Sequence, residues 1–405
     1  MNSFDKETSE PSLQKYERRY DLDWLRIIAI FLVFIYHCAR FFDSEDWHVK
    51  NDIVDKYLIG YFTFLTGIGM PLFFMIAGMG AFYALKFLKG KKYILARFIR
   101  LMVPFLFGIF THISIQVYLE RINHGAFSGS FFEFYFTKYY NGLYGFGGNF
   151  AWIGLHLWFL VLLFLFSLIT LPLFTYLGKE KNHDKLLLLG SFFKKPGALL
   201  LFMIIPIIIE LFNPFDGDGG IPRFGGWNII SLLIFTIYGF LLVSNEHFKK
   251  SIENNERISS VIGVISVVLL IIVLAFFFDA IFYNDQFTIA DPLFWIIRGM
   301  YGWCWIIILL NIGRRYLNFN SKSRRFLNEI VMPFYILHQT IIVIIGFFII
   351  ELEILIIVKY IIISSVSLAI ILGLVLLIRK LNFLRFLFGM RLKKKKVVEE
   401  KPVEP

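Results

Sequence analysis

Ten long apolar stretches alternate with short polar segments along the chain. A helix needs about 20 mainly apolar residues to cross a hydrocarbon core about 30 Å thick. The stretches cover residues 23–42, 57–85, 98–119, 155–178, 198–212, 227–244, 258–279, 293–312, 330–350 and 354–378. The pattern predicts an all-α, polytopic integral membrane protein with about ten transmembrane helices. The fifth stretch is short, and we expect Pro71 to kink the second or to split off an interfacial turn.

Lysine and arginine residues gather in every second connection, which predicts an orientation. With alternating connections, 33 of the 41 Lys and Arg residues fall on the face that also holds both termini. By the positive-inside rule that face is cytoplasmic. We therefore expect a multi-pass protein of the cell membrane, with a cytoplasmic tail at residues 1–20, a transmembrane domain at 21–380 and a basic cytoplasmic tail at 381–405.

Composition supports the membrane class and excludes several others. Hydrophobic residues make up 58% of the chain, whereas soluble domains have about 45 to 50%. The net charge of +11 is explained by the basic connections, so no nucleic acid partner is expected, and the run Lys393 to Lys396 suits anchoring to anionic lipid. Cys38 and Cys304 both lie in apolar stretches, so neither a disulfide framework nor a cysteine metal site is expected. The polar first twenty residues predict no cleaved signal peptide.

The first stretch carries two ionisable residues, Arg26 and His37. An ionisable side chain inside a span costs several kcal/mol unless it faces water, a partner or a ligand. Eleven residues separate the two, so they lie within roughly 20° of each other around the helix and roughly 16 Å apart along it. If the helix begins near Asp23, His37 lies roughly 21 Å deep while Arg26 stays at the entry surface. Both side chains should then face one groove.

Two arginines at the start of the third stretch, Arg97 and Arg100, share a helix face because they are three residues apart. Beside Arg26 their guanidinium groups would suit a ligand that carries phosphate. Taken alone, they are better explained as interfacial anchors of a basic connection.

Four further polar residues are candidates for substrate contact or for supporting the site. Arg40 follows His37 by one turn and continues its polar stripe, and His112 lies at the same estimated depth as His37. His156 and His338 lie in the fourth and ninth stretches, and each histidine could instead be satisfied by a hydrogen bond inside the bundle.

Few signals point to other chemistry. The pair Asp216 and Asp218 lies in a Pro/Gly-rich segment that a turn explains better than a metal site, and no metal site is expected. The chain has no phosphate-binding loop, dinucleotide fingerprint, zinc-protease motif or serine nucleophile elbow.

Several of these motifs together resemble the acyltransferase 3 family of integral-membrane acyltransferases, over roughly residues 20 to 380. They are Arg26 with His37 eleven residues later, Arg97-x-x-Arg100 leading into a proline, Pro71-Leu-Phe-Phe-Met-Ile-Ala-Gly78, His156-Leu-Trp-Phe-Leu160 and Phe334-Tyr-Ile-Leu-His-Gln339. Where many members have Ser-Gly in the second-span motif, this chain has Ala77-Gly78, so that serine cannot be essential here.

The resemblance implies transfer of an acyl group, often acetyl, from cytoplasmic acyl-CoA to a hydroxyl of a glycan or other envelope molecule. It implies that His37 is the essential histidine and that Arg26, Arg97 and Arg100 serve the CoA side. Acyl-CoA would be a co-substrate, and no permanently bound cofactor is expected. The other expected partners are a glycan or lipid-linked acceptor and membrane lipids; the sequence does not predict an oligomeric state.

Two versions of the chemistry remain open, with His37 acting as a general base or forming a covalent acyl-histidine. Two other classes of function also remain open. One is a transporter or flippase for an envelope precursor, with the intramembrane His and Arg residues lining its pathway. The other is a non-catalytic family member that binds acyl-CoA or scaffolds an envelope complex.

Overall fold

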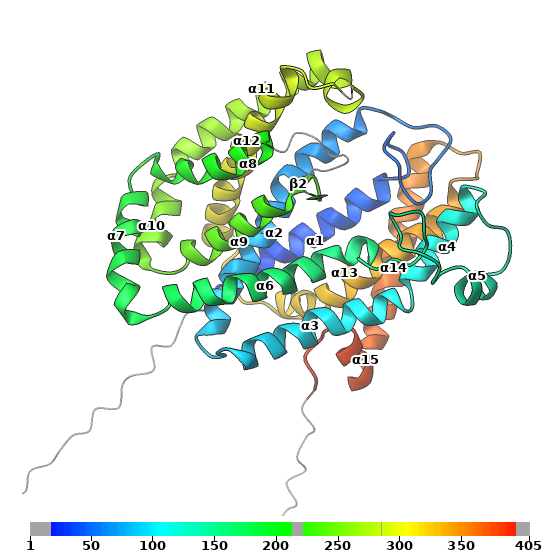
Figure 1. Cartoon of the computed structure of the whole chain (residues 1–405), viewed down its shortest axis with the longest axis horizontal. Coiled ribbons are helices and arrows are strands. Elements are labelled where there is room, and N and C mark those ends of the chain that lie inside the picture. Colours follow the sequence, from blue (N-terminus) through cyan, green and yellow to red (C-terminus); the bar gives the residue numbers. More distant parts are fainter. Residues whose placement is uncertain (1–17, 213–221, 285, 394–405) are drawn as a thin grey trace, which may run out of the picture.

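A bundle of long helices makes up nearly all of the computed structural model, which describes residues 18–212, 222–284 and 286–393 (Figure 1). The helices are α1 (Tyr20–Ala39), α2 (Leu58–Leu85), α3 (Lys91–Ile109), α4 (Ile113–Asn123), α5 (Phe131–Thr137), η1 (Leu155–Leu157), α6 (Trp158–Leu177), η2 (Glu180–Asn182), α7 (His183–Phe193), η3 (Ala198–Met203), α8 (Ile204–Phe212), α9 (Ile229–Leu242), α10 (Glu246–Asn254), α11 (Glu256–Phe282), α12 (Ala290–Tyr316), α13 (Lys322–Ile349), α14 (Ile356–Ile378) and α15 (Asn382–Leu387). Among the described residues, one short antiparallel hairpin of β1 (Arg223–Phe224) and β2 (Trp227–Asn228) is the only sheet. The all-α prediction is confirmed.

The predicted number of membrane spans is also confirmed. In the described part of the chain, eight helices are long and apolar enough to cross a membrane, and the number reaches ten if each of two bent pairs is one span. The bent pairs are Glu180–Phe193 with Ala198–Phe212, at 105°, and Ile229–Leu242 with Glu246–Asn254, at 109°. These pairs contain the predicted fifth and sixth spans, and the bends explain why the fifth was short.

Two predicted spans differ in detail. Pro71 lies inside the single helix α2 and splits off no turn. The helix is nevertheless tied to its neighbours one to two turns before the proline, where Tyr301 donates to the carbonyl of Thr63 and the Trp227 indole donates to that of Thr66. The third span is broken between α3 and α4, and His112 lies in the break.

Close backbone packing joins α2 to α9. A Cβ added at Gly78 would lie 1.9 Å from the carbonyl oxygen of Thr236, and one added at Gly239 would lie 2.0 Å from that of Met75. Small residues allow this approach between membrane helices. Gly78 of the second-span motif therefore has a packing role.

Two large hydrophobic clusters and two smaller ones form the interior of the described part of the chain. One large cluster gathers mainly side chains of α1, α3, α4, α13 and α14, and the other gathers mainly side chains of α2, α6, α9 and α12. Helices α1, α2 and α6 contribute to both large clusters, so they form the boundary between them. The cavity beside His37, which we call the main cavity, lies along this boundary.

The chain beyond residue 380 is folded for part of its length. Helix α15 packs on α3, and Arg385 forms an ion pair of 2.7 Å with Glu329 of α13. The predicted C-terminal tail thus begins as a packed segment. Residues 1–17 of the N-terminal tail, the pair Asp216 and Asp218, and Lys394 to Lys396 of the basic run lie outside the described residues.

Candidate functional site

Helices α1 and α13 share a row of polar contacts. The contacts join Asp23 with Arg324, Arg26 with Asn328, and His37 with His338. Arg26 and His37 therefore both face α13, as their spacing along α1 predicts. His37 lies in the last turn of the helix and Arg26 in its second turn.

The hydrogen bonds around His37 and His338 assign the proton positions on both rings. Nδ1 of His338 lies against the carbonyl oxygen of Tyr335, so it carries the proton and donates, which leaves Nε2 as an acceptor. Nε2 of His338 is 3.2 Å from Nδ1 of His37, which also lies 2.9 Å from the carbonyl oxygen of Val33. Nδ1–H of His37 is thus shared between two acceptors. Nε2 of His37 keeps a lone pair that has no hydrogen-bond partner among the described residues.

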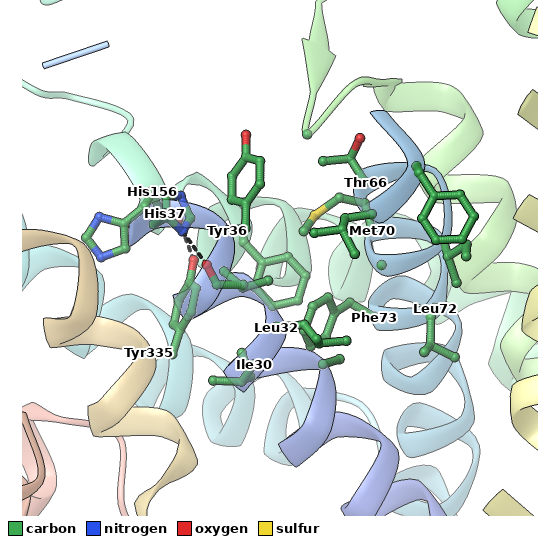
Figure 2. Close-up of a pocket in the computed structure, with 18 of the residues that line it drawn as sticks. Ile30, Leu32, Tyr36, His37, Thr66, Met70, Leu72, Phe73, His156 and Tyr335 are labelled. Carbon is green, nitrogen blue, oxygen red and sulfur yellow. Dashed lines mark hydrogen bonds between the residues drawn. The ribbon is translucent and has the colours of Figure 1, made fainter. Parts of the chain in front are cut away.

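A cavity of about 430 Å³ lies beside this histidine pair. Its lining comes from α1, α2, α6, α12, α13 and the turns next to them, and it is mainly apolar. His37, His156 and Tyr335 gather at one end, and Thr66, Met70 and Leu72 lie on the far side (Figure 2). The volume falls in the range of about 300 to 1,000 Å³ typical of small-molecule sites.

Two other predicted histidines meet at one backbone oxygen. Nε2 of His112 and Nε2 of His156 each lie 3.1 Å from the carbonyl oxygen of Ile336. His112 also contacts the Thr111 hydroxyl and does not line the cavity. His156 does line it, and its buried Nδ1 has no partner in the described part of the chain. The ring centroids of His156 and His338 are 5.0 Å apart.

A strained turn holds His156 in place. Gly154 has φ +81°, and Leu155 has φ +50°, the one positive φ outside glycine in the described ranges. A bulky residue in this region is unusual, and such strain tends to accumulate at functional sites. The Tyr335 hydroxyl donates to the carbonyl oxygen of His156 and so fastens the turn to α13.

The predicted arginines form a cationic cluster at the other end of α1. The positive charges of Arg26, Arg97 and Arg391 all act on Arg100, and the carboxylate of Asp23, which lies 3.4 Å from Arg26, opposes them. Among the described residues, no carboxylate lies within 4.0 Å of Arg97, Arg100 or Arg391. The guanidinium of Arg97 lies 5.2 Å from the Tyr93 ring centroid. We call the end of the bundle that holds these four arginines the arginine end.

Arg391 was not among the predicted residues. It reaches the cluster because the chain after α15 returns to α3, where a Cβ at Gly389 would lie 2.7 Å from the carbonyl oxygen of Arg100. The sequence places Arg391 in a basic terminal segment with no pattern that predicts this return.

Arg40 lies in a separate ionic network at the opposite end of α1. Its guanidinium is 2.7 Å from Asp43 and 2.6 Å from Glu45, and Lys50 is 2.8 Å from Asp43. Burial raises the pKa of the Asp43 carboxyl above its ordinary value, against the opposing effect of the two cations. Arg40 does not line the main cavity, so its contacts organise the connection between α1 and α2.

A buried polar network beside His37 also escaped prediction. The Gln339 amide donates to Nε2 of His48 at 3.0 Å and to Gln116 at 3.1 Å. Nδ1 of His48 donates to Glu120, which also accepts from the Tyr144 hydroxyl at 2.8 Å. Only Gln339 stood in a recognised motif, next to His338. A loop histidine paired with a distant glutamate leaves no local sequence pattern.

Comparison with known proteins identifies the family of this chain. The profile of an acyltransferase domain matches residues 19–379. Two curated relatives, from Salmonella schwarzengrund and Salmonella heidelberg, are both called glucans biosynthesis protein C. Each is 20% identical over 351 residues, which cover 81% of this chain and 83% of the relative. No solved structure matches. Because the profile spans most of the sequence, the chain belongs to the acyltransferase 3 family and is a multi-pass membrane acyltransferase that transfers groups other than aminoacyl groups.

Proposed function

We propose that this protein transfers an acyl group, most simply acetyl, from cytoplasmic acyl-CoA to a hydroxyl of a glycan in the cell envelope. The observation that carries this proposal is the free Nε2 of His37. It belongs to a ring held by His338 at the polar end of the cavity, on the same helix as Arg26.

The distance along α1 supports the donor side. Eleven residues of helix put Arg26 and His37 roughly 16 Å apart. The pantetheine arm of CoA has a backbone about as long as four extended residues, which is about 14 Å, and an arginine side chain adds reach. Phosphates bound at the arginine end would therefore leave the thioester near His37. The apolar cavity wall suits the uncharged arm.

The chemistry follows from the proton positions. Nε2 of His37 accepts the proton of the acceptor hydroxyl while its oxygen attacks the thioester carbonyl. The new C–O bond forms, the C–S bond breaks, and the departing thiolate takes the proton from Nε2. His338 accepts from Nδ1–H throughout and so stabilises the positive charge on the ring. General base catalysis of this kind is worth about 10²- to 10⁴-fold.

Orientation and acceptor rest on other observations. The basic connections favour a cytoplasmic arginine end, which is the side where CoA is available. Both chain termini and the arginine cluster would then face the cytoplasm, with the segment between α4 and α6 on the outer side. The name of the Salmonella relatives, glucans biosynthesis protein C, supports a glycan as acceptor.

The test uses purified protein in nanodiscs, labelled acetyl-CoA, and laminaritetraose and maltotetraose as acceptors. We expect labelled oligosaccharide and released CoA from the parent protein, and a loss of at least 100-fold in His37→Ala. Full activity in His37→Ala would refute the proposal, and so would oligosaccharide uptake into proteoliposomes without CoA release. Labelled protein trapped before acceptor is added would identify the acyl-histidine version.

A further inference from the structure

A second, smaller cavity lies at the end of the bundle opposite the arginine cluster. It has a volume of about 190 Å³ and is formed by the segment that precedes α6 and by the β1–β2 hairpin. Aromatic rings provide much of its lining: Tyr144, Trp152, Trp158 and Phe224. No residue of the lining is charged.

Two thin elements separate this aromatic cavity from the cavity that holds His37. In the turn before α6, Leu155 lines the aromatic cavity, His156 lines the main cavity, and Trp158 lines both. In the hairpin, Phe224 lines the aromatic cavity and its neighbour Gly225 lines the main one. The two spaces therefore share one wall, and Trp158 is common to both.

The aromatic walls are held in position by other contacts. The Trp152 indole donates to the carbonyl oxygen of Tyr144 at 3.2 Å, and the Tyr144 hydroxyl donates to Glu120. The ring centroids of Trp158 and Phe224 are 5.2 Å apart. Trp152 remains 40% exposed, so the cavity can be reached from outside the bundle. The indole N–H of Trp158 has no partner within the described ranges and remains available to a ligand.

We propose that this cavity binds one pyranose ring of the acceptor glycan and presents a hydroxyl of that sugar, past Trp158, to His37. The inference rests on the proposed function and adds the acceptor subsite to it. At about 190 Å³ the cavity is larger than one of about 150 Å³ that holds a benzene ring, and it is reached from outside beside Trp152, so a pyranose ring can stack on its aromatic wall with its hydroxyl groups directed out of the cavity. The C–H faces of a pyranose carry partial positive charge and pack on the negative faces of aromatic rings.

Other exposed aromatic residues on the same side have a different arrangement. Phe132 and Phe136 of α5 are 71% and 74% exposed, stand four residues apart on one helix face and line neither cavity. Exposed phenylalanines on one helix face suit burial of that face in a membrane interface. They provide a matched control, because they belong to the same segment between α4 and α6.

The experiment measures sugar binding by saturation-transfer NMR with the full chain in nanodiscs, using laminaritetraose and maltotetraose as probes. We expect saturation of the ring protons of at least one probe, a loss of fivefold or more in Trp152→Ala, recovery in Trp152→Phe, and no change in Phe132→Ala. Absence of signal for both probes, or an equal signal in Trp152→Ala, overturns the inference. Equal melting temperatures show that the variants are folded.

Turnover separates this inference from the proposed function. With the oligosaccharide that is acylated, Trp152→Ala should raise the KM for acceptor at least fivefold and leave acetyl-CoA binding unchanged. Acyl transfer with an unaltered acceptor KM refutes the aromatic subsite alone. Sugar binding without any acyl transfer refutes the proposed function and leaves the binding site standing.

Discussion

Replacing His338 by Phe tests whether the histidine pair acts as described. The change fills a similar volume but removes the acceptor 3.2 Å from Nδ1 of His37. In the resting protein the substitution should cost little stability. The carbonyl of Val33 still accepts from the same N–H at 2.9 Å, and a neutral hydrogen bond contributes only about 1 kcal/mol.

The missing hydrogen bond costs more in the transition state, because the His37 ring is then positively charged. A hydrogen bond from a charged donor contributes about 1.5 to 3 kcal/mol. At about 1.4 kcal/mol per factor of ten, kcat should fall about 10- to 150-fold. The KM values should change little because His338 does not line the main cavity and so does not bind the substrates. His338→Gln, which keeps an acceptor near the position of Nε2, should recover part of the rate.

The assay is steady-state CoA release at saturating acceptor, with acetyl-CoA affinity measured separately. An unchanged kcat in His338→Phe would show that Val33 alone positions His37. A loss that appears only in KM, or an equal loss in the Gln variant, would assign His338 a packing role and refute the proton positions.

Two further predictions concern the donor path. Arg100→Gln and Arg391→Gln should each weaken acetyl-CoA binding about tenfold or more, because each removes a charged donor from the cluster. The control Lys92→Gln, which changes an exposed lysine, should bind acetyl-CoA as the parent protein does. Equal affinities of all these proteins in calorimetry would show that the two arginines only set the membrane orientation. Ala29 lines the main cavity one turn from Arg26, so Ala29→Phe should block the pantetheine arm and raise the Kd for acetyl-CoA while adenosine 3′,5′-bisphosphate, which lacks the arm, binds as before. A parallel loss for both ligands would mean that the arm does not pass Ala29.

Features that depend on local patterns could be predicted from the sequence, whereas features that depend on contacts between distant segments could not. Apolar length gave the spans, because each helix must satisfy its own backbone in the bilayer. The facing of Arg26 and His37 followed from helix periodicity alone. The 105° and 109° bends, the break at His112 and the return of Arg391 depend on contacts between distant segments, and such contacts leave no periodic signal.

His37 and His112 illustrate the same difference between local patterns and distant contacts. Depth along a span placed His112 and His37 together, yet His112 points its Nε2 at the Ile336 carbonyl and lies outside the cavity lining. Depth in the membrane alone does not place a side chain in a site, because the side chain must also point toward that site from its helix. That direction was available for His37 through Arg26, but the break between α3 and α4 removes it for His112.

Helix α13 contains a pattern that does connect the two ends of the site. Its partners for α1, Arg324, Asn328 and His338, lie at spacings of four and ten residues. Both spacings bring a side chain back to within about 80° of the first around a helix of 3.6 residues per turn. On α1 the corresponding residues, Asp23, Arg26 and His37, follow the same rule. A polar stripe on each of two apolar spans is costly unless the stripes face one another. Matching such stripes would have paired α1 with α13 and identified His338 as the partner of His37.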